Sequence, residues 1–258
     1  MKRRLLLLAL TGVIAACKSS DYAPTGTLSV TFTHWVNDLP LFLNTGKYQN
    51  GAGESFTVTK FDYFISNIRL LRADGSAYTV PQDDSYFLIR SSDATSRQVT
   101  LPTIPAGTYS QIEFMIGVDS LRNTADVSRR TGVLDPGGSH TSGMYWDWNT
   151  GYIHLKLEGT SPSAPVDATG ARNFRYHIGL FGGYQSRTLN NLRMVRVPMG
   201  TAGTIPDAGA ASLLVKADVG KLFDGPTPIR IAQYPDVMIS PVSATIADNY
   251  TTMFSRYD

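Results

Sequence analysis

Short segments in which apolar and polar residues alternate recur along most of this chain. The run 28–34 alternates strictly, and the runs 56–71, 85–90 and 109–118 are rich in aromatic and β-branched residues. Such alternation is typical of β-strands with one buried face, and turn-forming residues separate the runs about every ten residues, as in sandwiches and barrels. We therefore expect an all-β fold, an antiparallel β-sandwich or barrel-like domain with long loops.

The C-terminal segment has a different period. Val242, Ile246 and Tyr250 are spaced as one face of a helix, and the pair Ser240 and Pro241 suits its N-cap and first helical position. We expect a C-terminal helix that packs across the sheet or over its open end.

The segment 119–140 has no sustained period and contains Asp135-Pro136-Gly137-Gly138. Long loops in compact domains are more often functional than idle, so we expect an excursion over one end of the sheet that covers or frames a site. His140 lies in this segment, and we expect it to be exposed and without a ligand.

The first residues predict export from the cytoplasm. A basic start at Met1–Arg4 precedes an apolar run, 5–14, that is too short to span a bilayer permanently. The sequence Ile14-Ala15-Ala16-Cys17 resembles the bacterial lipobox, in which the cysteine is the lipid attachment point. Cys17 is the only cysteine, so it cannot form an internal disulfide. The alternative is an ordinary signal sequence with a stray cysteine.

These features predict the organisation of the whole chain. We expect a protein anchored by lipid at Cys17 in the cell envelope, facing the periplasm or at the outer membrane. Its expected parts are a lipoprotein signal peptide at 1–16, a flexible tether at 17–26 and a single β domain at 27–258.

Charge and motifs exclude several classes of function. The net charge of +2 is small and scattered, which argues against a nucleic-acid partner. The chain has no nucleophile elbow, no phosphate-binding glycine loop, no cysteine pair for zinc or iron and no His-Glu-x-x-His sequence. We therefore expect a protein that is not an enzyme.

The segment 143–159 combines aromatic residues with a strand pattern. Trp146 and Trp148 stand two residues apart beside Tyr145, so an extended backbone would place both indoles on one side as an aromatic slab. The alternative is that these aromatic residues fill the core. The strand that follows places Ile153 and its alternate neighbours on one face, and His154, Lys156 and Glu158 on the other.

Histidines are candidate metal ligands on three predicted strands. His34 ends an apolar face, where it is either a metal ligand at the rim of the core or a buried imidazole satisfied by the backbone. His154 and His177 both lie on the polar sides of their strands. Pairing them directly would place Lys156 opposite Arg175, whereas a slip of two residues would place Glu158 against Arg175 and separate the histidines.

Imidazoles without a thiolate and beside an indole, in an exported domain, favour copper among the metals that imidazole binds. Four blocks of sequence also resemble a known family. Residues 61–70, 117–123, 143–159 and 176–179 are similar, in this order, to the MbnP-like family of bacterial extracytoplasmic proteins. The resemblance implies a secreted β protein whose copper is held by two histidines and a tryptophan oxidised to kynurenine. It also implies a di-haem partner of the peroxidase type that carries out the oxidation.

Carrying the family's ligands onto this chain gives an ordered set of candidates. His177, in the Tyr-His-Ile-Gly block, is the first metal ligand, followed by His34 and His154. Trp146 and Trp148, with Tyr145, are candidates for lining the site, and the two tryptophans also for oxidation. In the family the modified tryptophan stands two residues before a ligand histidine, and this chain has no Trp-x-His, so the resemblance does not extend to a kynurenine ligand.

Two hypotheses of different classes follow. The first is a lipid-anchored extracytoplasmic copper-binding protein for copper acquisition or storage. The second is a metal-free binding or scaffold module of the cell envelope that presents an aromatic patch to a partner protein or a glycan.

Overall fold

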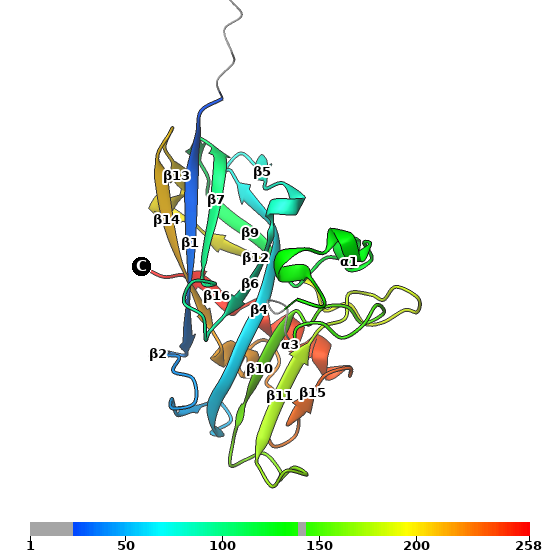
Figure 1. Ribbon diagram of the computed structural model, residues 1–258. Coiled ribbons are helices and arrows are strands. Elements are labelled where there is room, and N and C mark those ends of the chain that lie inside the picture. Colours follow the sequence, from blue (N-terminus) through cyan, green and yellow to red (C-terminus); the bar gives the residue numbers. More distant parts are fainter. Residues whose placement is uncertain (1–22, 139–142) are drawn as a thin grey trace, which may run out of the picture.

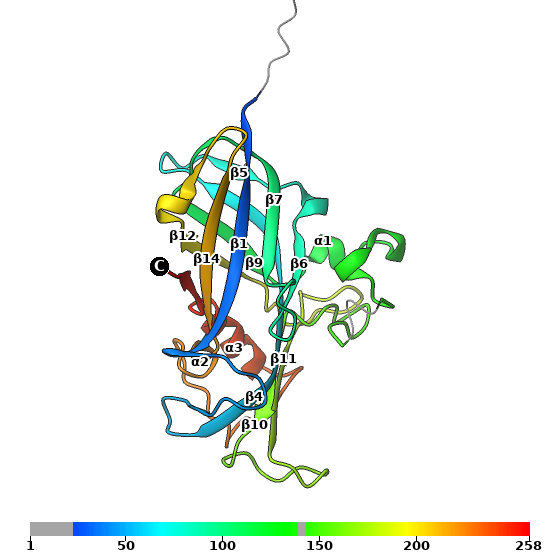
Figure 2. The ribbon, with the colours of Figure 1, turned by 60° about the vertical axis from the view of Figure 1, so that its left-hand side comes forward.

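The computed structural model describes residues 23–138 and 143–258. Strands dominate it, as the alternating segments predict, and they form curled sheets that enclose an apolar core (Figures 1 and 2). The signal peptide, Cys17 and His140 lie outside the described residues. Within the described part of the chain, no helix combines the length and the apolar character needed to cross a membrane.

The first sheet is built around β1, in which every second residue is buried. β1 begins at Thr25, slightly before the expected start of the domain, and runs antiparallel to β7 and parallel to β14. The parallel pairing is an exception to the expected antiparallel arrangement. The strands of this sheet are β1 (Thr25–Val36), β2 (Leu39–Pro40), β7 (Gln98–Pro105), β14 (Ala210–Asp218) and β16 (Phe254–Arg256).

The second sheet is built around the long strand β4, which pairs with β10 and β9 and also with β6. Its pairings are antiparallel except that β15 runs parallel to β11. The strands are β3 (Tyr48–Gln49), β4 (Ser55–Leu71), β5 (Ala77–Thr79), β6 (Tyr86–Arg90), β9 (Gln111–Ile116), β10 (Leu155–Thr160), β11 (Asn173–Ile178), β12 (Arg193–Pro198) and β15 (Asp236–Val237).

Aromatic side chains join the two sheets. Phe32 of β1 meets Tyr63 of β4 with 6.1 Å between ring centroids and Phe114 of β9 with 5.9 Å. Phe254 of β16 packs edge-on against Phe114 at 5.2 Å. Because these residues are almost fully buried and their edge-to-face contacts add to the burial of apolar area, this group is the centre of the main core.

The opposite face of β4 is also buried, because the segment between β9 and β10 folds over it. This segment contains α1 (Ser120–Asn123), η2 (Val127–Arg129) and η3 (Gly132–Leu134), and Figure 1 shows it in green beside β4 and β6. Phe64, Leu134, Met144 and Tyr152 belong to the second apolar cluster that lies beneath it. The excursion predicted from residues 119–140 therefore does cover one part of the sheet.

The C-terminal helix is present, but its start differs from the prediction. α3 (Val242–Tyr250) contacts α2 (Gly220–Phe223) and β11. No side-chain hydrogen bond caps it, and the carbonyl of Ser240 instead accepts hydrogen bonds from the backbone and hydroxyl of Ser243. The remaining elements are β8 (Gly107–Thr108), β13 (Thr204–Ile205), η1 (Gln82–Asp84) and η5 (Gly200–Gly203).

Candidate functional site

A row of charged and polar side chains crosses the outer face of the second sheet. Arg90 of β6 pairs with Asp62 of β4, Asp62 with Lys156 of β10, and Lys156 with His177 of β11. Register partners on adjacent antiparallel strands project to the same face of a sheet. These four residues therefore form one transverse row, which we call the charged row.

His177 lies at one end of the charged row and is hydrogen-bonded to Glu158. Its Nε2 lies 2.7 Å from Oε1 of Glu158. Burial lowers the pKa of His177, and the positive charge of Lys156 adds to this, although Glu158 opposes it. The imidazole is thus neutral at pH 7, and Nε2 donates its proton to the carboxylate. The lone pair is then on Nδ1, which forms no hydrogen bond with the described residues.

The centre of the charged row is enclosed. Asp62 and Lys156 are 4% and 7% exposed, and the ammonium of Lys156 donates to the backbone carbonyl of Gly143. Gly143 begins the segment 143–152, which we call the aromatic loop. Burial raises the pKa of Asp62 against the effect of three neighbouring cations, and burial lowers the pKa of Lys156. Nη2 of Arg90 is buried and has no hydrogen-bond partner among the described residues. This row holds buried charges that are only partly compensated.

The aromatic loop is a tight turn rather than an extended strand. Tyr145 and Tyr152 form an isolated bridge, and the carboxylate of Asp147 accepts hydrogen bonds from the backbone of Asn149 and Thr150. The turn separates the two indoles, so the predicted slab of Trp146 and Trp148 on one side of a strand is not formed. Side chains i and i+2 lie on the same side of the backbone when it is extended, and the backbone of this turn is not extended.

Trp146 and Trp148 therefore have different surroundings. Trp146 packs so closely on Gly179 that a Cβ there would lie 2.6 Å from its Cζ3. Trp148 is 42% exposed, and the guanidinium of Arg130 lies 4.0 Å from its ring centroid. The ring of Tyr184 is 6.5 Å away on the next loop.

His34 of β1 lies between the two sheets, against the inner face of β4. Its ring is 5.1 Å from Phe61 and 5.8 Å from Tyr63, which belong to the main core, whereas Asp62 between them faces outward. Nδ1 lies 2.7 Å from the hydroxyl of Ser91, and Nε2 lies 3.2 Å from the hydroxyl of Tyr63. Burial, helped by the charge of Arg97, lowers the pKa of His34 to about 3. His34 is thus a buried imidazole, but its partners are two side-chain hydroxyl groups and not the backbone groups that were expected.

His154 is fully buried just before β10. Its Nε2 lies 3.4 Å from the carbonyl of Leu180, and its Nδ1 has no hydrogen-bond partner in the part of the chain that the structure describes. Nδ1 abuts the backbone of Gly117, where a Cβ would come within 2.5 Å of it. Burial lowers the pKa of His154 to about 4 against the effect of the Leu180 carbonyl. The ring has no open space in which to accept a ligand.

The expected convergence of His34, His154 and His177 does not occur. The register places Glu158 opposite Arg175 and Lys156 opposite His177, so His154 and His177 are not paired. His34, on β1 of the first sheet, contacts the inner face of the second sheet at Phe61 and Tyr63, whereas His177 lies on the outer face of the second sheet, as Asp62 does. Within residues 23–138 and 143–258, no group of three or more His, Cys, Asp and Glu side chains could hold a metal ion.

Sequence reasoning missed Arg90, Asp62 and Arg130. A signal for Asp62 was present, because it is a single acid within the apolar run Phe61–Ile65. Arg130 is 1% exposed and had no signal, because its burial depends on the fold of the excursion. Pairing across the sheet, which places Arg90 beside Asp62, also cannot be read from either segment alone.

Comparisons with known proteins agree with this architecture. The structure is similar to that of MbnP from Methylosinus trichosporium, with a TM-score of 0.58 and 18% identity over 81% of this chain and 80% of that one. No curated protein sequence gives a significant match. The model of the MbnP family matches residues 25–239, from the first strand to beyond β15. This chain belongs to the MbnP family.

Proposed function

We propose that this protein is a lipid-anchored extracytoplasmic copper-binding protein, used in copper acquisition or storage, with His177 as its principal ligand. The observation that carries the proposal is the hydrogen bond between Nε2 of His177 and Glu158, in a chain of the MbnP family. A carboxylate on the second ring nitrogen fixes the tautomer and orientation of a ligating imidazole and raises its basicity. Nδ1 of His177 is the atom left to bind copper.

The other candidate ligands support the proposal less. Both ring nitrogens of His34 are engaged in the core, so a metal there would have to displace Ser91 or Tyr63. His154 is 0% exposed and is packed against Gly117. Lys156, as the register partner of His177, disfavours a cation by its charge. His177 and Glu158 thus fit copper as one imidazole with its supporting carboxylate, and further ligands would have to join them.

Copper per chain, measured on the processed protein in detergent, tests this proposal. His177→Ala is expected to lower the affinity for copper by about tenfold or more. Even the loss of a group that only hydrogen-bonds to a metal ligand lowers metal affinity on that scale. His34→Gln is the matched control and is expected to bind as the unchanged protein does. The proposal fails if the unchanged protein binds no copper, or if His177→Ala binds it equally well.

Anchoring at Cys17 is a separate part of the proposal, supported by the lipobox-like sequence 14–17. Cys17→Ser is expected to release the protein from the membrane fraction, and intact mass should lose the acyl chains. A Cys17→Ser protein that stays in the membrane fraction would contradict anchoring at Cys17.

Intact mass also reports whether Trp146 or Trp148 is oxidised, which is the change that a di-haem partner of the peroxidase type would produce.

A second candidate function is a metal-free binding module. Trp148 and Tyr184 are 42% and 55% exposed, and their loops are clamped because Oδ1 of Asn149 accepts hydrogen bonds from three successive backbone amides, 184–186. Rigid exposed aromatic rings suit a glycan or a partner protein. Binding of a glycan or envelope protein by the copper-free protein, lost in Trp148→Ala and Tyr184→Ala but kept in His177→Ala, would favour this function.

A further inference from the structure

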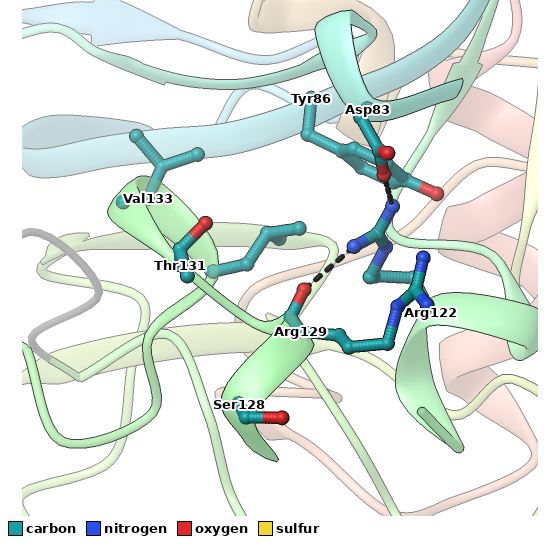
Figure 3. A pocket seen from close by; sticks show the side chains of 9 residues that line it. Asp83, Tyr86, Arg122, Ser128, Arg129, Thr131 and Val133 are labelled. Atoms are coloured by element: carbon teal, nitrogen blue, oxygen red, sulfur yellow. Dashed lines mark hydrogen bonds and ion pairs between the residues drawn. The ribbon is translucent and has the colours of Figure 1, made fainter. Parts of the chain in front are cut away.

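A polar hollow opens between the excursion and the strand β6, away from His177 and the charged row. Its volume is about 490 Å³, and Tyr86, Arg122, Arg129 and Val133 are among the residues that line it (Figure 3). A neighbouring hollow of about 470 Å³ shares Asp83, Arg122 and Arg129 with it. The two arginines thus stand between two accessible spaces.

Arg122 is held rigidly. Its guanidinium forms an ion pair with Asp83, donates to the carbonyl of Arg129 at 2.6 Å and lies 4.9 Å from the ring centroid of Tyr86. Figure 3 shows these two hydrogen bonds as dashed lines. A cation fixed in this way loses little conformational freedom when a ligand arrives.

Arg129 has a positive charge that is not matched by a close partner. Its guanidinium forms no hydrogen bond or ion pair with the described residues, although its charge helps to lower the pKa of Asp83. The wall of the first hollow carries two guanidinium groups, of Arg122 and Arg129, against the single carboxylate of Asp83. This hollow therefore has an excess of one positive charge.

Two further carboxylates, of Asp119 and Asp126, are close by, but neither lines the first hollow. Asp119 lies behind Tyr86, where it accepts hydrogen bonds from the Tyr86 hydroxyl, the Gln82 amide and the backbone of Arg122. Asp126 lines only the second hollow and accepts from the backbone and hydroxyl of Ser128. The first hollow is thus the one suited to an anion.

The first hollow also has a free polar group and an apolar wall. The hydroxyl of Thr131 forms no hydrogen bond within the described residues, and Val133, Leu134 and the ring of Tyr86 supply apolar surface. We propose that this hollow binds a small organic carboxylate, with its oxygens on Arg129 and its apolar body against the ring of Tyr86. One excess positive charge balances a monoanion, whereas a phosphate group carries about −1.5 to −2 at pH 7. The proposal does not depend on copper binding.

Amide chemical shifts of the processed protein in detergent, followed during titration with benzoate, test this site. Saturable shifts confined to residues 82–86 and 128–134 are expected, with affinity in the millimolar range for so small a ligand and weaker binding at higher salt. Benzamide has the same shape without the charge, and acetate has the charge without the ring, so both are expected to bind more weakly. Inorganic phosphate that binds as well as benzoate would overturn the assignment to an organic carboxylate.

Two arginine variants locate the site. Arg129→Gln is expected to weaken benzoate binding by about tenfold or more, the scale of one lost charged hydrogen bond. Because the side chain of Arg129 is exposed and makes no hydrogen bond to residues 23–138 or 143–258, the variant should melt at the same temperature. Arg187→Gln removes an exposed arginine outside the hollow and should bind benzoate normally. Absence of saturable binding, or equal loss in the two variants, would refute the site.

Discussion

The two faces of β4 are buried by different means. Its inner face, with Phe61, Tyr63 and Ile65, packs against the first sheet through aromatic contacts. Its outer face carries Asp62, and Phe64 on the same face packs into the second apolar cluster, which the segment between β9 and β10 helps to form. The histidines near the two faces also differ. Both ring nitrogens of His34, against the inner face, have hydrogen-bond partners, whereas His177, on the outer face, has a partner for Nε2 alone among the described residues. Of these two histidines, His177 is the one with a ring nitrogen available to bind a ligand.

The largest expected effect concerns packing. Phe32→Ala should lower the free energy of unfolding by about 4–5 kcal/mol, and Phe64→Ala by about 2–4 kcal/mol, because the excursion can collapse around the smaller residue and the two facing sheets cannot. Urea unfolding measures both. An equal loss in the two variants would mean that the outer face is as rigid as the core.

Gly179 tests how tightly the outer face is covered. In Gly179→Ala the new Cβ would lie 2.6 Å from Cζ3 of Trp146 and 2.8 Å from the carbonyl of Tyr152, so we expect a loss of about 1–3 kcal/mol and a shifted tryptophan fluorescence. Gly137→Ala is the control, since its nearest neighbour would be 3.7 Å away. Unchanged stability and fluorescence in Gly179→Ala would show that Trp146 does not rest on Gly179.

Lowering the pH should reduce the free energy of unfolding more through His34 than through His177. The pKa of His34 falls from 6.5 to about 3 on folding, so between these values the unfolded chain binds more protons and stability is lost as the pH falls. His34→Gln should flatten the dependence of stability on pH between pH 4 and 6 by up to about 1.4 kcal/mol per pH unit. His177→Gln should flatten it less, because Glu158 supports its protonated form. Equal slopes in the two variants would contradict the comparison.

The smallest effect concerns the partner of His177. Glu158→Gln removes the negative charge that raises the pKa of His177, so this pKa should fall further, as an NMR titration of the imidazole would show. The ring of His34 should titrate as before. The loss of stability should stay below about 1 kcal/mol, because the pair is partly exposed. An unchanged pKa of His177 would mean that the hydrogen bond is absent in solution.

Local patterns in the sequence determined much of the fold. The strict alternation in 28–34 predicts β1, and the stripe of Val242, Ile246 and Tyr250 predicts α3, because periodicity depends only on neighbouring residues. The long excursion was also predictable, since its sequence has no period. The parallel pairing of β1 with β14 was not, because it joins segments far apart in the chain.

The candidate site depended on the tertiary structure. The sequence identified His177 and its polar face, and left two registers open between β10 and β11. The fold selects the one that places Glu158 opposite Arg175, and this brings Lys156 beside His177. A shift in register changes every neighbour across a sheet, and contacts from other strands and the excursion decide it. The sequence therefore determined which residues lie on strands, and the packing of distant segments decided which of them meet.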